Sequence, residues 1–298
     1  MTELENNLTQ ILSEKSTKII PENIKKDVSI FGITGTLESN DLSDYFNLEP
    51  PNLINGYSYG FKDLILKIPD NLDLSQTKHI SWFFKDLSGI KHIPMLDITK
   101  FTDTSQMFYE CHNLIDIPQL DTSNVKDMSL MFQGCWKLKT VPLLDTSNAK
   151  DMSHIFQECR SLKSIPAFNT SKNTNFTLFI GIVEGTEGSL IEFPSIDTSK
   201  GEKFWRMCYR QKSLVTVPVL DLSGVTTVSN NLTDMFGFCT SLSDDSLNNI
   251  MASLATVADT GTTNKTLAYI GLTSGQANKC KTLSNYSAFT AAGWTTGY

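Results

Sequence analysis

A unit of about 24 residues repeats along the middle of the chain, and a repeat of this kind constrains the fold more than any other feature. The stretches His112–Cys135 and Trp136–Cys159 are almost the same sequence written twice. One proline marks each of seven units, and subtracting neighbouring positions gives separations of 25, 24, 24, 24, 28 and 24 residues. A fixed period of this length is typical of repeat architectures. The prolines are Pro69, Pro94, Pro118, Pro142, Pro166, Pro194 and Pro218.

Apolar residues occupy fixed places relative to each proline, and polar residues fill most of the rest. One such unit is too short to bury its own apolar side chains, so neighbouring units have to share a core. We therefore predict a β-rich α/β solenoid, in which about seven coils stack in parallel from about Leu64 to Cys239. Hydrogen bonds between coils would set a rise of about 4.8 Å, and identical places would form continuous ladders.

The course of one coil follows from its turn residues. Proline has no N–H to donate, so a strand is expected to end at it, as in Leu138–Val141. The Asp121–Asn124 stretch is predicted to turn, because short polar side chains there bond their own backbone. A second extended piece is expected at Val125–Met128, followed by a corner that ends at Cys135.

Two ladders of identical side chains are expected inside the stack. Cysteines one coil apart in parallel would place their Cβ atoms about 4.8 Å apart, beyond the roughly 3.5–4.5 Å that a disulfide prefers. We interpret them as buried thiols, with disulfides and a metal site as the alternatives. Trp82–Phe84 and Phe204–Trp205 match core places as well. The predicted ladders are Cys111, Cys135 and Cys159, and Phe108, Phe132 and Phe156.

A column of aspartates lies three residues after the prolines, at Asp97, Asp121, Asp145, Asp197 and Asp221. Such a row of carboxylates invites calcium, but the following Thr-Ser-Asn residues supply turn chemistry and not a cation loop. We therefore expect side-chain turns and predict no metal, no cofactor and no catalytic residue. The four histidines occupy unrelated places in the repeat, which favours surface positions.

A candidate binding rim follows the corner cysteines. His112, Trp136 and Arg160 would lie on successive coils, where they could stack on a sugar or pair with a carboxylate. A solvated edge without a ligand is the alternative. The variable residues of the adjoining strand would share one face with the rim and complete the candidate site, namely Asp116, Thr140, Ser164 and Glu192.

The consensus LxxIPxLDTSNVxDMSxMFxxC, read from His112–Cys159, resembles the BspA-like type of bacterial surface-protein leucine-rich repeat. The resemblance covers the seven units and weakens at residues 169–211, where the Asp-Met-Ser step and the corner cysteine are lost. It implies a right-handed, curved solenoid that binds other molecules and has no catalytic chemistry.

Four segments are expected along the chain: an attachment module at 1–39, a connector and N-terminal cap at 40–62, the solenoid at 63–240 and a C-terminal α/β cap at 241–298. In the first, Leu4–Leu12 could form a short helix, and a strand pair or hook is expected around Ile30, Phe31, Gly32 and Ile33. In the last, helices are expected at Leu247–Val257, started by Ser243, and around Ser274–Leu283.

The segment IPENIKKDVSIFGITGT, within Ile19–Ser39, is similar to a short module of tail, tail-fibre and baseplate proteins of phages that infect Gram-positive bacteria. The closing SAFTAAGWTTGY resembles the C-terminal cap of such phage repeat proteins. The resemblance implies that the N-terminal segment docks to other tail or baseplate proteins and that the repeats bind a glycan or protein of the host cell surface. Homo-oligomers, trimers among them, would fit such a fibre.

Composition narrows the function classes. A net charge of −7 without a basic cluster argues against nucleic acid as a partner, and no apolar run is long enough to insert in a membrane. The N-terminus has no signal-peptide pattern and no anchor follows Ile270, so synthesis in the host cytoplasm and a place in the virion tail are expected. The alternative is a bacterial cell-surface leucine-rich-repeat adhesin. A carbohydrate-active enzyme would need two carboxylates facing each other across a cleft.

Overall fold

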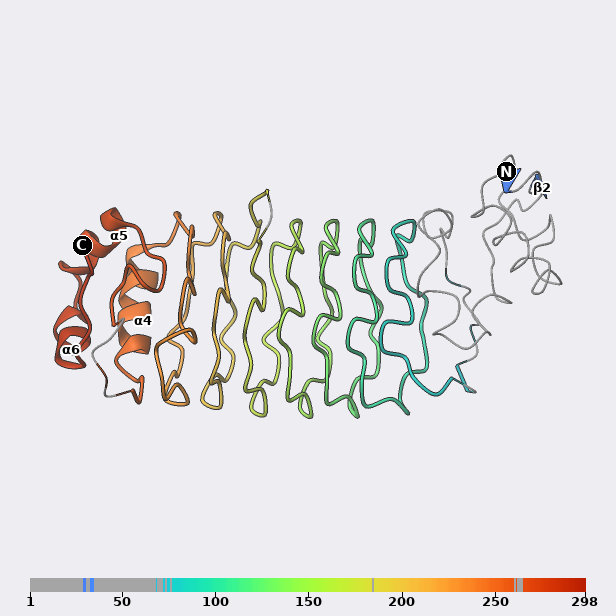
Figure 1. Ribbon diagram of the computed structural model, residues 1–298, viewed down its shortest axis with the longest axis horizontal. Helices are drawn as coiled ribbons and strands as arrows, with labels where there is room; N and C mark the ends of the chain where they lie inside the picture. Colours follow the sequence, from blue (N-terminus) through green and yellow to red (C-terminus); the bar gives the residue numbers. More distant parts are fainter. Residues whose placement is uncertain are drawn as a thin grey trace, which may run out of the picture.

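The computed structural model describes residues 77–183, 185–259, 261 and 265–298, together with residues 68, 72, 74 and 75 and the backbone of 29–30 and 33–34. In Figure 1 the chain is a row of flat coils lying side by side, each made of two extended runs joined by tight turns, and helices close the C-terminal end. One cluster of buried hydrophobic side chains extends from Ile68 to Trp294. The predicted repetitive stack is confirmed.

The core lies between the two runs of each coil. The run that carries the proline buries Leu114, Ile117 and Leu120, and the other run of the same coil buries Met128 and Phe132. Between the two runs, the hydroxyl of the buried Thr122 donates to the Asp145 carbonyl of the next coil at 2.8 Å. The same bond recurs at Thr146, Thr170 and Thr198, so a threonine in this turn ties each coil to its neighbour.

The second run is a series of overlapping turns and not a strand. The N–H groups of Leu130, Phe132 and Gly134 donate to carbonyls of the next coil at 2.9–3.0 Å. The N–H groups of the residues between them donate to carbonyls three residues earlier in the same coil. The third residue of two of these turns has positive φ, 60° at Leu130 and 75° at Gly134, as a type II turn requires. All backbone groups of the run are thereby used within the stack.

Regular strands are largely missing from the repeats, which corrects the predicted parallel β-stack. In the described residues, Leu138–Val141 is not a strand, and the solenoid has isolated parallel bridges only. Most bridges lie on the second run, as in Asp103–Asp127 and Asp127–Asp151. In the first run the bond from the Lys139 N–H to the Ile115 carbonyl is followed by a proline without an N–H, so no continuous ladder forms.

Stacked rings form the predicted phenylalanine ladder. The Phe132 ring lies 5.7 Å from that of Phe108 and 5.9 Å from that of Phe156, with interplanar angles of 6°. Phe84 extends the ladder by one ring, at 5.3 Å from Phe108. The core prediction is wrong for two tryptophans. Trp82 is 46% exposed and has a φ of 52°, and Trp205 is only half-buried, while the neighbouring phenylalanines fill the core.

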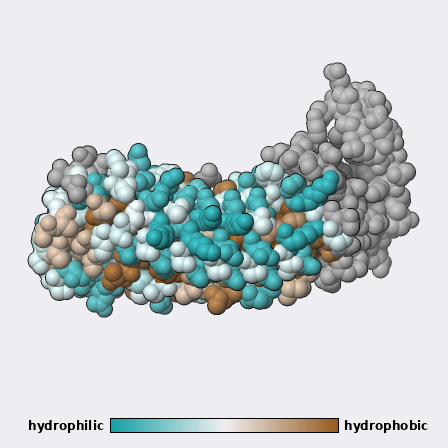
Figure 2. Space-filling view, turned by 90° about the horizontal axis from the view of Figure 1, so that it is seen from below, coloured by the Kyte–Doolittle hydropathy of each residue, from teal (hydrophilic) through white to brown (hydrophobic). Residues whose placement is uncertain are grey.

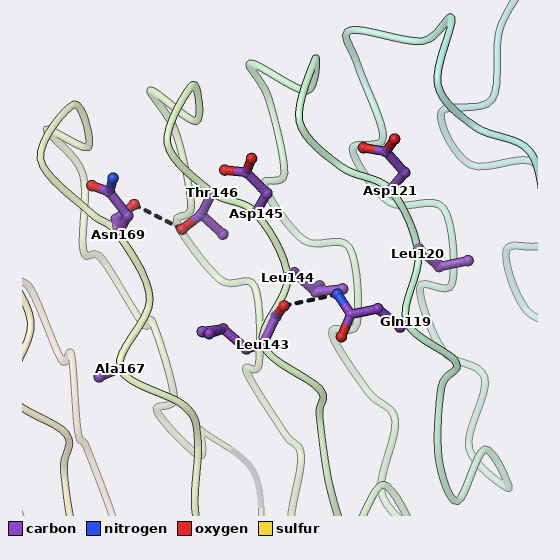
Figure 3. A pocket seen from close by; sticks show the side chains of 9 residues that line it. All are labelled: Gln119, Leu120, Asp121, Leu143, Leu144, Asp145, Thr146, Ala167 and Asn169. Atoms are coloured by element: carbon purple, nitrogen blue, oxygen red, sulfur yellow. Dashed lines mark hydrogen bonds between the residues drawn. The ribbon is translucent and has the colours of Figure 1, made fainter.

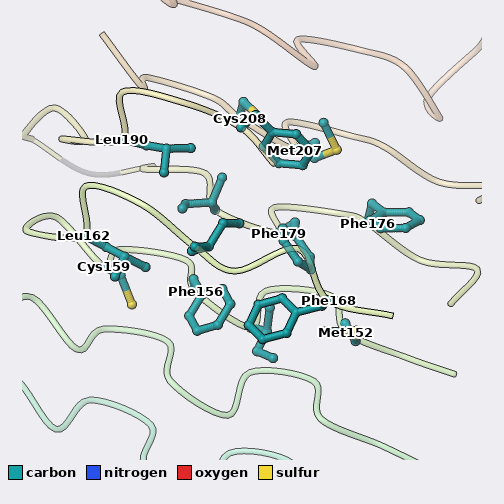
Figure 4. Close-up of a cluster of buried hydrophobic side chains, with 14 of the residues drawn as sticks. Met152, Phe156, Cys159, Leu162, Phe168, Phe176, Phe179, Leu190, Met207 and Cys208 are labelled. Atoms are coloured by element: carbon teal, nitrogen blue, oxygen red, sulfur yellow. The ribbon is translucent and has the colours of Figure 1, made fainter. Parts of the chain in front are cut away.

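The ladder changes where the sequence pattern weakens. Phe179 meets Phe156 edge-on at 88°, and Phe168 stacks on Phe156 instead, as the cluster in Figure 4 shows. In the next coil Gln211 takes the place of the corner cysteine. It is fully buried, and its side-chain amide donates to the Ile180 carbonyl at 2.6 Å. A bulkier side chain thus makes the bond that a thiol makes elsewhere.

The corner cysteines are buried free thiols, as predicted. The thiols of Cys111, Cys135 and Cys159 donate to carbonyls of the preceding coil at 3.1–3.3 Å. Burial raises the pKa of the Cys135 and Cys159 thiols, and it raises the pKa of Cys239 to about 12 and that of Cys280 to about 11.

Because a thiol reacts as its thiolate, the folded protein is expected to resist alkylation. Iodoacetamide at pH 8 should modify few of the six cysteines in the native protein and all six after unfolding in guanidinium, as counted by mass spectrometry. Rapid native labelling of Cys135 would contradict its burial.

Helices close the C-terminal end. Helix α4 (Asp244–Leu254) begins at the predicted N-cap Ser243, α5 (Ser274–Cys280) occupies part of the predicted second helix, and α6 (Tyr286–Ala291) was not predicted. Hydroxyls of Ser246, Ser253 and Thr256 each accept a backbone N–H of residues 217–222 at 2.8 Å. Polar side chains of α4 and the turn after it therefore satisfy the edge of the last coil, which would otherwise be open to pairing.

Near the N-terminus, strands β1 (Ser29–Ile30) and β2 (Ile33–Thr34) pair antiparallel, with Ile30 opposite Ile33. This confirms the expected strand pair, whereas Phe31, Gly32, the helix expected at Leu4–Leu12 and the connector lie outside the described residues. Where the structure describes the chain, no helix is long and apolar enough to cross a membrane.

Candidate binding surface

The predicted rim is a tight column of side chains, defined here as Glu110, His112, Trp136, Glu158 and Arg160. The rings of His112 and Trp136 stack with centroids 3.7 Å apart, and the Arg160 guanidinium lies 4.5 Å from the Trp136 ring centroid. Carboxylates hold both ends, since His112 Nε2 is 2.5 Å from Glu110 Oε2 and Arg160 Nη2 is 2.9 Å from Glu158 Oε2. The sequence prediction that these residues lie on successive coils is correct.

This packing limits what the rim column can bind. His112 and Arg160 each stack against the Trp136 ring, and only 38% of the tryptophan is exposed. A sugar would have to displace one of these neighbours to stack on the indole. The column therefore exposes an indole edge, and its charged side chains are already paired with each other. Its contacts mainly stabilise the packing of three coils.

The other predicted site residues lie on a different part of the coil, which we call the proline wall: the residues two and three places before each proline and the one directly after it. Thr140, Ser164 and Glu192 are exposed there, and Asp116 is half-buried. Asp116 pairs with His92 of the preceding coil, with Oδ1 2.8 Å from Nδ1. Buried leucines such as Leu138 separate the two sets along each coil.

The proline wall also carries apolar side chains that sequence reasoning missed. Beside the predicted polar residues lie Met95, Leu143, Ile191, Val215 and Val219, which are 39–63% exposed. A signal in the sequence could have revealed them. The residue directly after each proline changes in character from coil to coil, whereas the buried residues on either side of this pair stay apolar. The changing residues are Met95, Gln119, Leu143, Ala167, Ser195 and Val219. The face of the molecule seen in Figure 2 is mainly hydrophilic, with small, separate hydrophobic spots.

An open depression of about 530 Å³ lies beside Leu143 on the proline wall (Figure 3). Its floor is fixed by hydrogen bonds between coils, from the Gln119 side chain to the Leu143 carbonyl at 2.8 Å and from the Thr146 hydroxyl to the Asn169 carbonyl at 2.7 Å. Asp121, Asp145 and Asn169 line one side, so the depression joins apolar surface to hydrogen-bond acceptors.

The carboxylates of the depression make the predicted side-chain turns. Oδ1 of Asp121 and Oδ1 of Asp145 accept the backbone N–H two residues on, at 3.1 and 2.9 Å, and Asn169 does the same with its amide oxygen. Bonds from Ser123 and Ser147 hold the pKa of Asp121 and that of Asp145 below their ordinary value. A second column of such turns, at Asp103, Asp127 and Asp151, was not predicted.

These turns predict how stability depends on pH. A carboxyl whose pKa is lowered in the folded state stabilises it fully above the unfolded pKa of about 3.9, and this contribution is lost as the pH falls towards the folded value. The melting temperature should therefore fall as the pH is lowered from about 5 to 3. In Asp121→Asn/Asp145→Asn, which copies Asn169, we expect a near-normal melting temperature at pH 7 and a shallower fall. Equal slopes in the two proteins would contradict the turn assignment.

The two aspartates of the depression act as hydrogen-bond acceptors in their turns, and their pKa values are lowered for that reason. Within residues 77–183, 185–259, 261 and 265–298, no group of three His, Cys, Asp or Glu side chains is placed to hold a metal ion. The arrangement is suited to holding a ligand by hydrogen bonds and apolar contact.

One family model matches the central coils. Residues 78–193 match the model of the family described as "Mycoplasma protein of unknown function, DUF285". No curated protein and no solved structure matches the chain. The matched residues contain the phenylalanine and cysteine ladders and the rim column. The central coils are thus similar to the DUF285 family, a Mycoplasma-type repeat related to the BspA-like repeats that the sequence resembles.

Proposed function

We propose that this chain is a non-enzymatic binding protein of the leucine-rich-repeat class, in which the proline wall engages a glycan or protein on a bacterial host surface. The observation that carries the proposal is the concentration of exposed apolar side chains on one wall. Of the nine large hydrophobic residues that are exposed in the described chain, five lie there: Met95, Leu143, Ile191, Val215 and Val219. Exposed apolar surface without a role in the core favours a contact site.

The structure of the wall supports this role in a second way. The core places keep nearly the same residue from coil to coil, whereas the wall changes at each step between apolar, polar and charged side chains, as from Ile115 through Lys139 and Lys163 to Ile191. Packing between coils requires the constant core residues, but it does not require the variation on the wall. A rigid stack with a varied face is suited to recognising an extended ligand.

We further propose that the N-terminal segment attaches the chain to a phage tail or baseplate, with oligomers forming there. The support is the similarity of Ile19–Ser39 to phage tail modules, together with the strand pair formed by β1 and β2 inside that segment. The alternative is a cell-surface adhesin, which is favoured by the greater extent of the BspA-like resemblance, since it covers all seven units.

A charged substitution on the wall tests the binding role. Leu143 is 60% exposed, so Leu143→Arg should fold normally while reducing binding of the purified protein to whole host cells about tenfold or more. Thr102→Arg is the matched control, because Thr102 is exposed on the other run of the coil. If both variants bind cells as the unmodified protein does, the proline wall is not the contact face.

Attachment is tested separately from binding. When the phage gene encodes the protein without residues 1–39, the assembled particles should lack the protein. The purified truncated protein should still bind host cells. Unchanged incorporation would exclude docking through this segment. Detection of the protein on the surface of uninfected cells, and not in particles, would establish the adhesin.

A further inference from the structure

Two arginines and three aromatic residues gather on the outer corner of the last two coils. We call this set, Trp205, Arg206, Tyr209, Arg210 and Phe238, the arginine–aromatic patch. It lies further along the edge of the stack that carries the rim column, since Arg210 and Phe238 occupy the place of Glu110 and Glu158, and neither the repeat consensus nor the proposed binding face accounts for it. Trp205, expected in the core, is only half-buried.

The side chains of the patch are held by one another. The Arg206 guanidinium lies 4.9 Å from the Trp205 ring centroid and 4.5 Å from that of Tyr209. The Arg210 guanidinium lies 5.8 Å from Tyr209 and 5.4 Å from Phe238, and the two rings meet edge-on with centroids 5.4 Å apart. Stacking of this kind fixes the guanidinium groups in place, so that little conformational entropy is lost when a ligand binds.

The patch is positively charged on an acidic protein. The chain has a net charge of −7. Arg206 is partly neutralised by Asp234, with Nη2 3.3 Å from Oδ2. Arg210 contacts aromatic rings, and among the residues that the structure describes it has no ion-pair partner. One guanidinium is therefore available to an anion.

Phe238 places a large ring at a turn position where the repeat imposes positive φ. It is 57% exposed and has a φ of 61°, which is strained for a bulky residue. The same place in earlier coils holds smaller or polar side chains: Asp86, Glu110, Gly134, Glu158 and Arg210. The turn itself is common to the coils, so what distinguishes this place is the exposed aromatic ring, which contributes little to the core.

We infer that the arginine–aromatic patch binds an anionic sugar polymer. The exposed Phe238 ring offers an apolar face to a sugar ring, and Arg210 beside it offers paired N–H donors to a carboxylate or a phosphate. Both anions fit a guanidinium, so uronic acids and phosphodiester-linked sugars share this chemistry. The inference rests on the proposed function, because it names the ligand class of a surface-binding protein, but it places that ligand on a different face.

Affinity for defined polymers tests the inference. Binding of the full chain would be measured by biolayer interferometry to polygalacturonate, which carries carboxylates, and to purified wall teichoic acid, which carries phosphodiesters. Neutral dextran and polyglutamate separate sugar recognition from simple charge. We expect binding to at least one anionic polysaccharide, weaker at high salt, and about tenfold weaker in Arg210→Gln and in Phe238→Asn.

Melting temperatures show whether a variant loses affinity because it unfolds or because a binding side chain is missing. Phe238→Asn should melt at or above the temperature of the unmodified protein, because asparagine tolerates positive φ. The control is Trp82→Asn, since Trp82 is also exposed at positive φ but has no arginine stacked on it in the described chain, and its affinity should not change.

Three results would overturn the inference: no binding to either anionic polysaccharide, equal binding to dextran or polyglutamate, or full affinity in both patch variants. If the patch variants retain affinity while Leu143→Arg loses cell binding, the proposed function stands and this inference fails. If Leu143→Arg retains cell binding and the patch variants lose affinity, the proline wall fails instead.

Discussion

Replacing Phe132 with alanine is expected to lower the free energy of unfolding by about 3–5 kcal/mol. Phe132 is fully buried and stacks on rings of both neighbouring coils, so truncation leaves a cavity and removes two aromatic contacts at once. No neighbour can fill the space easily, because each coil is fixed by hydrogen bonds on either side. Urea unfolding followed by circular dichroism measures the change.

The control for Phe132→Ala is Leu143→Ala, also a large-to-small change but at a residue 60% exposed, where we expect a change within about 0.5 kcal/mol. A double-mutant cycle adds specificity. Phe108 and Phe132, in contact, should couple by about 0.5–1.5 kcal/mol, whereas Phe84 and Phe132, two coils apart, should be additive. Equal losses in Phe132→Ala and Leu143→Ala would contradict the buried ladder.

The second large effect is expected at the junction between the last coil and the cap. Gly271 has a φ of 91°, and a Cβ added there would lie 2.5 Å from the Gly237 Cα and 2.6 Å from its nitrogen. Beside it, the Asp234 and Phe236 N–H groups donate to the carbonyls of Tyr269 and Ile270, so the two backbones cannot separate without losing these bonds. Gly271→Ala should therefore cost about 2–5 kcal/mol from strain and overpacking together.

Gly293 separates the two causes. Its φ is 83°, but a Cβ there would meet nothing within 4 Å, so Gly293→Ala should cost only the strain, about 1–2 kcal/mol. Thermal melts of the two variants, compared at the same pH and salt, measure the difference. If Gly271→Ala is no less stable than Gly293→Ala, then the cap does not pack against the last coil as described.

The stack was predictable because a core place has to satisfy the coils above and below it in the same way. This requirement repeats one residue type at each buried place, as at Phe108, Phe132 and Phe156, and the spacing then reveals the period. The Ser243 cap of α4 was predictable for a similar reason, since it depends on neighbouring residues alone.

The turns of the second run could not be read from the sequence. Positive φ values fall on Gln106, Leu130 and Leu178, which are not residues that prefer them, because the hydrogen bonds of adjacent coils impose the conformation. The expected strand before each proline failed for the opposite reason. Its residues favour strands, but the stacked prolines interrupt the ladder.

The candidate site was predictable in position more than in chemistry. Spacing placed His112, Trp136 and Arg160 on neighbouring coils, but ring orientation, and so the covering of the indole by its neighbours, depends on side-chain packing. The depression beside Leu143 depends on small differences in side-chain size between coils, such as Gln119, Leu143 and Ala167, which no repeat consensus records.

Distances between coils test the central claim, that successive units lie directly on one another. Spin labels on cysteines introduced in one exposed place, pairing Thr216 with His92, Asp116 or Thr140, span five, four and three coils. The buried native thiols should stay unlabelled. Electron paramagnetic resonance should give distances of about 24, 19 and 14 Å, a constant step of about 4.8 Å per coil. Distances that do not shorten regularly with the number of coils would contradict the stack.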